Sequence, residues 1–153
     1  EGYEVVMTRT EDIMLTDPMI SSSKKAGDLS ARLKIAKKYE NAIFISIHMN
    51  AFTDGRYHGL QVYYSQNDET AVSLARHIQT DVRSALQPEN ERPIKPAGNN
   101  IYLLYKAIHP AVLIECGFLS NADECQRLAD EGYRKELSQV ICGALAKYIS
   151  EDY

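Results

Sequence analysis

The stretch AIFISIHMNA (residues 42–51) decides the fold, because it leads an apolar strand directly into a histidine, His48. Its apolar residues are too numerous for a strand with one face in water, so it predicts a strand of the sheet interior. A second apolar stretch, AVLIECGFLSN (residues 111–121), predicts another interior strand that ends on Glu115. Open α/β sheets bind ligands at the carboxyl ends of their strands, and we expect both polar side chains there.

Strands alternate with helices along the rest of the chain. This order predicts an α/β fold with a twisted, largely parallel sheet and helices on both faces. Besides the two strands above, we expect strands at residues 3–9 and 59–65 and a short extended piece at 101–105. Helices are predicted at residues 28–39, capped by Asp28 or Ser30, at 69–86, at 133–150, and in a short segment that Asn121 and Glu124 open as a capping box.

Length and composition exclude several classes of protein. The 153 residues predict a single domain, 1–153. A net charge of -4 without a dense basic patch argues against a nucleic-acid partner. No apolar run reaches the roughly eighteen residues of a membrane span. The three cysteines, Cys116, Cys125 and Cys142, show no CxxC spacing, so we interpret them as free core thiols, with a disulfide as the minority alternative.

The histidine and the carboxylate together indicate metal-assisted hydrolysis. A lone histidine after a strand is more often a packed structural residue, but His48 is flanked by Ser46 and Asn50, small polar side chains that can orient an imidazole. Glu115 follows three aliphatic residues, and its ionised form needs a cation or hydrogen bonds nearby. A metal that activates water and a carboxylate that transfers the proton would use both groups.

Other polar residues have weaker claims to a site. Lys95, Asn99 and Asn100 could form a polar rim for a glycan or peptide, although a Pro- and Gly-rich stretch alone explains an irregular loop there. We interpret His58 as a loop residue, with a place in a cleft as the alternative. His77 is expected in solvent on a helix, and His109 in the loop before Pro110. Arg32 could pair with a carboxylate, contact substrate or lie on a helix surface.

Several motifs in order resemble a known enzyme family. TRTED follows the YEVV strand, and then come FISIHMNA, GLQVYY, IKPAGNNIYLL and PAVLIECGFLSNADE. Together they are similar to the zinc-dependent N-acetylmuramoyl-L-alanine amidases of bacterial cell walls, over nearly the whole chain. The SIHMNA and VLIECGFLSN segments are the specific ones. The KPAGNNIYLL segment is most similar to the subgroup that takes part in forming muramic lactam in the spore cortex.

The resemblance implies roles for particular residues. His48 would bind Zn²⁺, Glu115 would be the catalytic acid and base, and Asn50, Lys95 and Asn99 would be candidate substrate-binding residues. The substrate would be peptidoglycan, cut between N-acetylmuramic acid and L-alanine of the stem peptide. The resemblance to the spore subgroup further implies work outside the cytoplasmic membrane, in the cell envelope, and an accessory protein.

One departure from the family pattern keeps alternatives open. The family's other two zinc ligands, a histidine in a DPGHGG loop and a glutamate after it, would lie upstream of Tyr3, together with a first strand. We therefore expect the natural protein to be longer and this chain to be an N-terminally truncated amidase domain. The alternatives are a non-catalytic peptidoglycan- or partner-binding remnant of the fold and a zinc carboxypeptidase-like hydrolase.

Overall fold

The structure is a computed structural model that describes residues 2–16, 19 and 23–151. Contacts within the chain divide it into two compact units, Glu1–Ala42 and Ile43–Tyr153. The second unit contains the whole sheet, so we describe it first and the first unit by itself afterwards.

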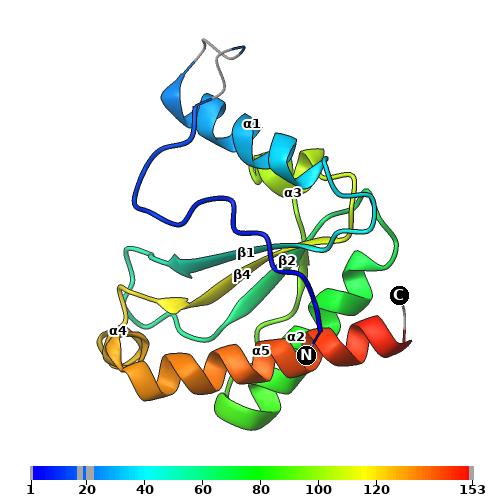
Figure 1. Cartoon of the computed structure of the whole chain (residues 1–153). Coiled ribbons are helices and arrows are strands. Elements are labelled where there is room, and N and C mark those ends of the chain that lie inside the picture. Colours follow the sequence, from blue (N-terminus) through cyan, green and yellow to red (C-terminus); the bar gives the residue numbers. More distant parts are fainter. Residues whose placement is uncertain (1, 17–18, 20–22, 152–153) are drawn as a thin grey trace. The chain divides into compact units, whose positions relative to one another are not determined.

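A four-stranded sheet is the centre of the second unit (Figure 1). In the order β1-β4-β2-β3, it comprises β1 (Phe44–Asn50), β4 (Ala111–Phe118), β2 (Gln61–Tyr64) and β3 (Lys95–Pro96). β1 is parallel to β4 and β3 is parallel to β2, while β2 runs antiparallel to β4. The predicted largely parallel sheet is therefore confirmed.

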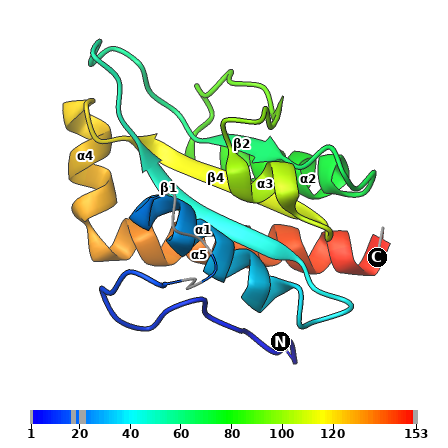
Figure 2. The ribbon, with the colours of Figure 1, turned by 90° about the horizontal axis from the view of Figure 1, so that it is seen from above.

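Helices cover both faces of this sheet. α2 (Ala71–Leu86) and α5 (Glu131–Glu151) lie side by side on one face, and the short α3 (Tyr102–Lys106) lies on the other (Figures 1 and 2). Alternate residues of β1, β4 and β2 point toward α2 and α5, as the strand period of two requires. The buried cluster on that face includes Val62, Leu74, Ile78, Val82, Val112, Ile114, Leu137, Ile141 and Tyr148.

The strand of residues 42–51 was expected in the sheet interior, and this prediction is wrong, because β1 lies at the edge of the described sheet and Ile47 is 61% exposed. The boundaries of β1 and β4 also differ from the prediction. β1 continues to Asn50 and β4 to Phe118, so His48 and Glu115 lie inside their strands rather than at the last residue. The register shifts between His48 and Asn50, because Asn50 pairs with Phe118. Between the His48–Glu115 and Asn50–Phe118 pairs, β4 has one residue more than β1. This is the arrangement of a β-bulge, a feature frequent beside active sites.

Residues 101–105 were expected to be extended, and this prediction is wrong. Residues 102–105 belong to α3, which Ile101 precedes, and the Tyr105 N–H donates to the carbonyl of Ile101 at 3.0 Å. A short apolar run such as IYLL does not by itself distinguish a strand from a helix. Here both Leu103 and Leu104 are buried, which a helical turn permits and a strand with one wet face does not.

The described residues of the first unit form one helix, α1 (Lys24–Ala36). It begins four residues before the predicted Asp28, because the Ser23 hydroxyl caps it by accepting from the Ala26 N–H at 3.0 Å. Asp28 instead lies within the helix. Its carboxylate accepts from the Leu15 N–H at 2.8 Å and from Nε of Arg32 at 2.7 Å, and the bond from Arg32 is the main reason why the pKa of Asp28 is lowered.

The strand predicted at residues 3–9 is absent from the structure, although all seven residues are described. A β-branched composition favours an extended chain, but a strand also needs a hydrogen-bonded neighbour. No strand among the described residues pairs with this segment, and Val5 is 79% exposed.

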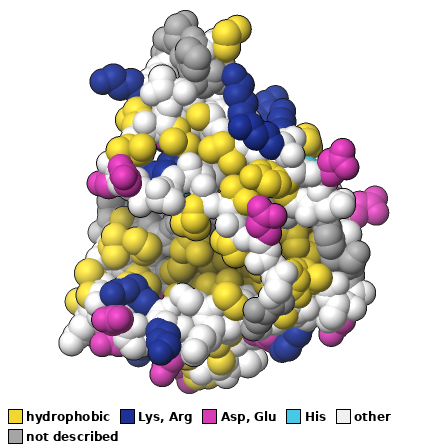
Figure 3. Space-filling view, viewed as in Figure 1, with side chains coloured by type: hydrophobic (Ala, Val, Ile, Leu, Met, Phe, Trp, Pro, Cys, Tyr) yellow, Lys and Arg dark blue, Asp and Glu magenta, His cyan; other side chains and the backbone are white. Residues whose placement is uncertain are grey.

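None of the described helices is long and apolar enough to cross a membrane. On the face shown in Figure 3, acidic and basic side chains are interspersed with hydrophobic ones. Of the three free cysteines, Cys116 is buried as expected, whereas Cys125 and Cys142 are exposed on α4 (Ala122–Ala129) and α5, where we had expected core thiols.

Candidate active site

His48 and Glu115 occupy paired positions on adjacent parallel strands, β1 and β4. Their side chains therefore point to the same face of the sheet, about 5 Å apart at the level of the backbone. Their neighbours Ile47 and Ile114 alternate to the opposite face, and Ile114 is fully buried in the core there. The alternation of the two strands thus places both polar groups on the face away from α2 and α5.

Glu115 is electrostatically unusual. Its side chain is half-buried, and its Oε2 atom is buried without a hydrogen-bond partner among the described residues. Burial raises the pKa of this carboxyl, and the nearby His48 opposes the rise in part. A carboxyl with a raised pKa and an unsatisfied oxygen suits proton transfer, because its two protonation states are closer in free energy near neutral pH.

His48 and Glu115 form a row of side chains across the strands, and Gln61 extends this row. Gln61 was not predicted from the sequence. It pairs with Glu115 on the antiparallel side of β4, so its side chain faces the same way. It is 1% exposed, and its amide donates to the carbonyl of Pro93 at 2.8 Å. Its Oε1 accepts from Nη2 of Arg92 at 2.5 Å. A glutamine within the apolar stretch GLQVYY was the signal for this position.

Glu124 connects the strand that carries Glu115 to the segment before the strand that carries Gln61, a role different from the capping role predicted from the sequence. Asn121 caps α4 as expected, since its side chain accepts from the Glu124 N–H at 3.1 Å. The Glu124 carboxylate does not complete the capping box. It accepts instead from the N–H groups of Gly59 at 2.9 Å and Phe118 at 2.7 Å. Glu124 thus joins the segment before β2 to the end of β4.

Two glycines make this junction possible. Gly59 has a φ of +92°, and a Cβ there would meet Oδ1 of Asn90 at 2.6 Å. A Cβ on Gly117 would meet the Glu124 carboxylate at 3.1 Å. The motifs containing HGLQ and ECGF therefore require glycine for the close approach of neighbouring groups.

The three candidate substrate-binding residues are spread around the row. Asn50 follows His48 on β1, and its Oδ1 accepts from the Ala51 N–H at 2.8 Å. Lys95 pairs with Tyr63 of β2, so it lies one row of side chains away on the same face as Glu115. Asn99 is exposed in the turn between β3 and α3. Their contact with substrate stays a prediction.

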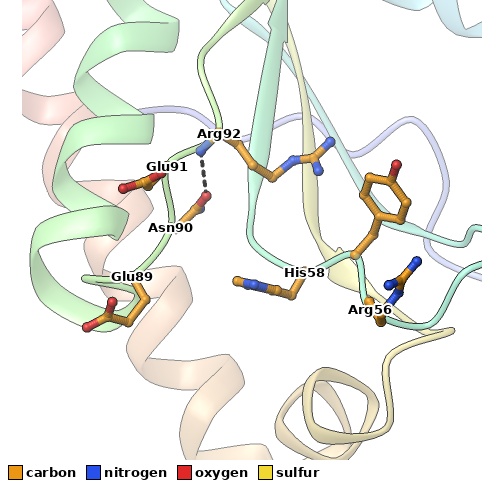
Figure 4. A pocket seen from close by; sticks show the side chains of 7 residues that line it. Arg56, His58, Glu89, Asn90, Glu91 and Arg92 are labelled. Atoms are coloured by element: carbon orange, nitrogen blue, oxygen red, sulfur yellow. Dashed lines mark hydrogen bonds between the residues drawn. The ribbon is translucent and has the colours of Figure 1, made fainter.

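A hollow of about 360 Å³ lies beside the row, between the loop before β2 and the loop after α2 (Figure 4). It is lined by Arg56, Tyr57, His58, Glu89, Asn90, Glu91 and Arg92. His58, which we had interpreted as a plain loop residue, therefore lines a hollow. The Phe52, Tyr57 and Phe118 rings form a chain of aromatic contacts next to it, with centroids 4.9 and 6.2 Å apart.

The remaining histidines lie elsewhere. His77 is on α2, with its Nε2 3.6 Å from a carboxylate oxygen of Glu151 on α5. His109 precedes β4 as predicted and is buried. In the first unit, Arg32 pairs with Asp28 and donates to the Thr8 hydroxyl at 2.9 Å, which matches the carboxylate-pairing alternative.

The donor types of the row fit a zinc ion only in part. Imidazole and carboxylate groups both occur in zinc sites, either as ligands or beside a ligand. Among the described residues, Oε2 of Glu115 has no hydrogen-bond partner, and Glu115 lies beside His48. The described residues contain no group of three or more His, Cys, Asp or Glu side chains that could hold a metal ion. This part of the chain therefore offers His48 as a single ligand.

Comparison with known proteins agrees with the resemblance in the sequence. The germination-specific N-acetylmuramoyl-L-alanine amidase of Bacillus subtilis is 31% identical over 153 residues, which cover 99% of this chain and 64% of that protein. The chain thus spans less than two thirds of that relative's length.

Solved structures give the same result. The CwlD amidase from Clostridioides difficile, solved in complex with the GerS lipoprotein, matches with a TM-score of 0.90 and 35% identity, over 99% of this chain and 78% of that one. The catalytic domain of CwlV, an N-acetylmuramoyl-L-alanine amidase from Bacillus (Paenibacillus) polymyxa var. colistinus, matches with a TM-score of 0.75 and 27% identity, over 96% and 73% of the two chains. The family model described as N-acetylmuramoyl-L-alanine amidase matches residues 1–147. The chain therefore belongs to the N-acetylmuramoyl-L-alanine amidase family.

Proposed function

We propose that the protein hydrolyses the amide between the lactyl group of N-acetylmuramic acid and the L-alanine of peptidoglycan stem peptides. The observation that carries this proposal is the pairing of His48 with Glu115, whose buried Oε2 has no partner among the described residues. Membership of the amidase family supports the choice of bond. Residues 1–153 would form one catalytic domain of the complete protein.

Glu115 would move the proton that this hydrolysis requires. A water molecule attacks the amide carbon, Glu115 accepts a proton from it, and the same carboxyl donates the proton to the departing alanine nitrogen as the C–N bond breaks. The burial that raises the pKa of Glu115 favours the protonated form that the second step needs. Asn50, Lys95 and Asn99 would contact the glycan or the peptide around this centre.

We also propose zinc as the cofactor, with His48 as one of its ligands. When bound, zinc would polarise the scissile carbonyl and lower the pKa of the attacking water. His48 would offer a ring nitrogen from β1, one strand away from Glu115. Catalytic zinc sites take about three protein ligands, so His48 alone would not retain the ion.

The relatives suggest where the protein works. Cell wall amidases act on a substrate outside the cytoplasmic membrane, and a germination-specific amidase is among the relatives. We propose the cell envelope as the location and modification of the spore cortex as the process. The Clostridioides difficile amidase was solved with a lipoprotein, which supports an accessory protein for this chain as well.

Zinc content and hydrolysis, measured together, test this proposal. The complete protein and the chain of residues 1–153 would each be analysed for zinc and incubated with a muramyl peptide whose released alanine amine is quantified. We expect about one zinc and hydrolysis for the complete protein, lost on chelation, and almost no zinc for residues 1–153. If the complete protein contained no zinc and hydrolysed no muramyl peptide, the proposal would be contradicted and the non-catalytic binding module would be favoured.

A further inference from the structure

Arg92 lies on the opposite side of Glu115 from His48. The row runs from His48 on β1 through Glu115 on β4 to Gln61 on β2, and Arg92 donates to the side chain of Gln61. With strands about 4.8 Å apart, the guanidinium lies on the order of one to two strand spacings from Glu115.

The charge of Arg92 is not neutralised within the described residues. No carboxylate there lies within ion-pair distance of its guanidinium, and its Nε atom is buried without a hydrogen-bond partner. The neighbouring Glu89 and Glu91 carboxylates point away from it in Figure 4. Arg56, on the other side of the hollow, differs in this respect because it is paired with Asp54 at 2.7 Å.

The guanidinium is also held in place before any ligand arrives. It lies 4.9 Å from the centroid of the buried Phe118 ring, in a cation–π arrangement. Gln61 fixes Nη2, and the Arg92 backbone N–H donates to Oδ1 of Asn90 at 3.0 Å. A guanidinium held by neighbours loses little freedom when it binds a planar anion, so this geometry is that of a built anion site.

We propose that Arg92 binds a carboxylate of the stem peptide, on the peptide side of the scissile amide. This inference rests on the proposed function and adds a specificity-determining residue to it. An extended chain advances about 3.3–3.6 Å per residue, so the second residue of a peptide whose first amide lies at Glu115 reaches the Arg92 position. The free carboxylate of an acidic second residue is the chemical group that matches a guanidinium there.

The acidic neighbours define the charge of the ligand. Glu89 and Glu91 line the same hollow and would repel a dianion such as a phosphate ester more strongly than a single carboxylate. Of the two guanidinium groups among the described residues that line the hollow, Arg92 has no carboxylate partner, and it balances one negative charge. A monovalent carboxylate therefore fits this site better than a phosphate.

Equilibrium binding separates this inference from the proposed function. The complete zinc-loaded protein carrying Glu115→Gln, which prevents turnover, would be titrated with N-acetylmuramoyl-L-alanyl-D-glutamate and with its α-amide, the isoglutamine compound. We expect the free acid to bind about 10- to 100-fold more tightly than the amide. Adding Arg92→Ala should reduce that ratio to about one, and Arg92→Lys should restore only part of it, because lysine lacks the planar fork.

Arg56→Ala is the matched control, because it removes a positive charge from the same hollow that already has its partner in Asp54. It should change the ratio less than two-fold. An equal ratio with and without Arg92, or equal binding of acid and amide to the protein that has Arg92, would overturn the inference. If the parent protein left both compounds uncut while the ratio depended on Arg92, the proposed function would fail and the carboxylate site would stand.

Discussion

His48 on β1 and Glu115 on β4 share one register position of a parallel strand pair, so neither can shift by one residue without moving to the opposite face. That opposite face is the core, where Val112 and Ile114 are fully buried. The packing of α2 and α5 on the sheet therefore fixes the register, and the register in turn fixes the imidazole beside the carboxylate.

Replacing Glu115 by glutamine tests its role in proton transfer. In the complete protein, Glu115→Gln should lower kcat by about 10²- to 10⁴-fold, because the amide has nearly the same shape but cannot carry the proton. The zinc content should stay the same, since Glu115 is proposed as an acid and base rather than a ligand. The measurements are turnover of a muramyl peptide and elemental analysis. A variant with normal turnover would remove Glu115 from the mechanism.

The same substitution should change how stability depends on pH. Burial raises the pKa of Glu115 in the folded chain above its unfolded value, so the folded state binds the proton more tightly. Its contribution to stability is therefore fully present below the unfolded pKa and is lost as the pH rises through the folded pKa. The metal-free Glu115→Gln variant should gain melting temperature over the parent at pH 7 and less at pH 4.

Thermal unfolding at the two pH values gives this comparison, with Glu136→Gln as the control because Glu136 is exposed on α5. The control should show the same difference from the parent at both pH values. A gain for Glu115→Gln that is larger at pH 4 than at pH 7 would contradict the raised pKa.

The sequence predicts the row's two main residues, His48 and Glu115, because each comes directly after a run of apolar residues typical of a strand. The apolar pattern correctly predicts β4 as an interior strand, but the same prediction is wrong for β1, which lies at the edge of the described sheet with Ile47 61% exposed. The pairing of β1 with β4 then places His48 beside Glu115. Gln61 and Arg92 could not be predicted in this way, because their place depends on β2 running antiparallel to β4 and on an irregular loop reaching back to it. Spacing alone assigns Glu124 a local capping role, whereas its carboxylate also accepts from Gly59, which precedes β2 and is distant in sequence, and from Phe118 at the end of β4.

The Glu124 carboxylate should be a main source of stability in the second unit. Glu124→Ala leaves the Gly59 and Phe118 N–H groups without their acceptor, at a cost of about 1–3 kcal/mol for each buried unsatisfied group. We expect a loss of about 2–4 kcal/mol in the free energy of unfolding, measured by urea denaturation. Gln126→Ala, on the exposed side of the same helix, should change it by less than about 0.5 kcal/mol. Equal effects of the two substitutions would mean that the two bonds contribute little.

Two glycine-to-alanine substitutions should have opposite effects on stability. Gly59→Ala places a Cβ 2.6 Å from Oδ1 of Asn90 and forces alanine to adopt a φ of +92°, so we expect a loss of about 1–3 kcal/mol. Gly143 lies inside α5 with open space around its Cβ position, so Gly143→Ala should gain about 0.5–1 kcal/mol from helix propensity. Urea denaturation of both variants provides the comparison. Because Asn90 also holds the Arg92 backbone, Gly59→Ala should in addition weaken binding of the acidic muramyl peptide, whereas Gly143→Ala should leave it unchanged. A stable Gly59→Ala variant with normal binding would show that the junction between the two loops adapts without affecting the site.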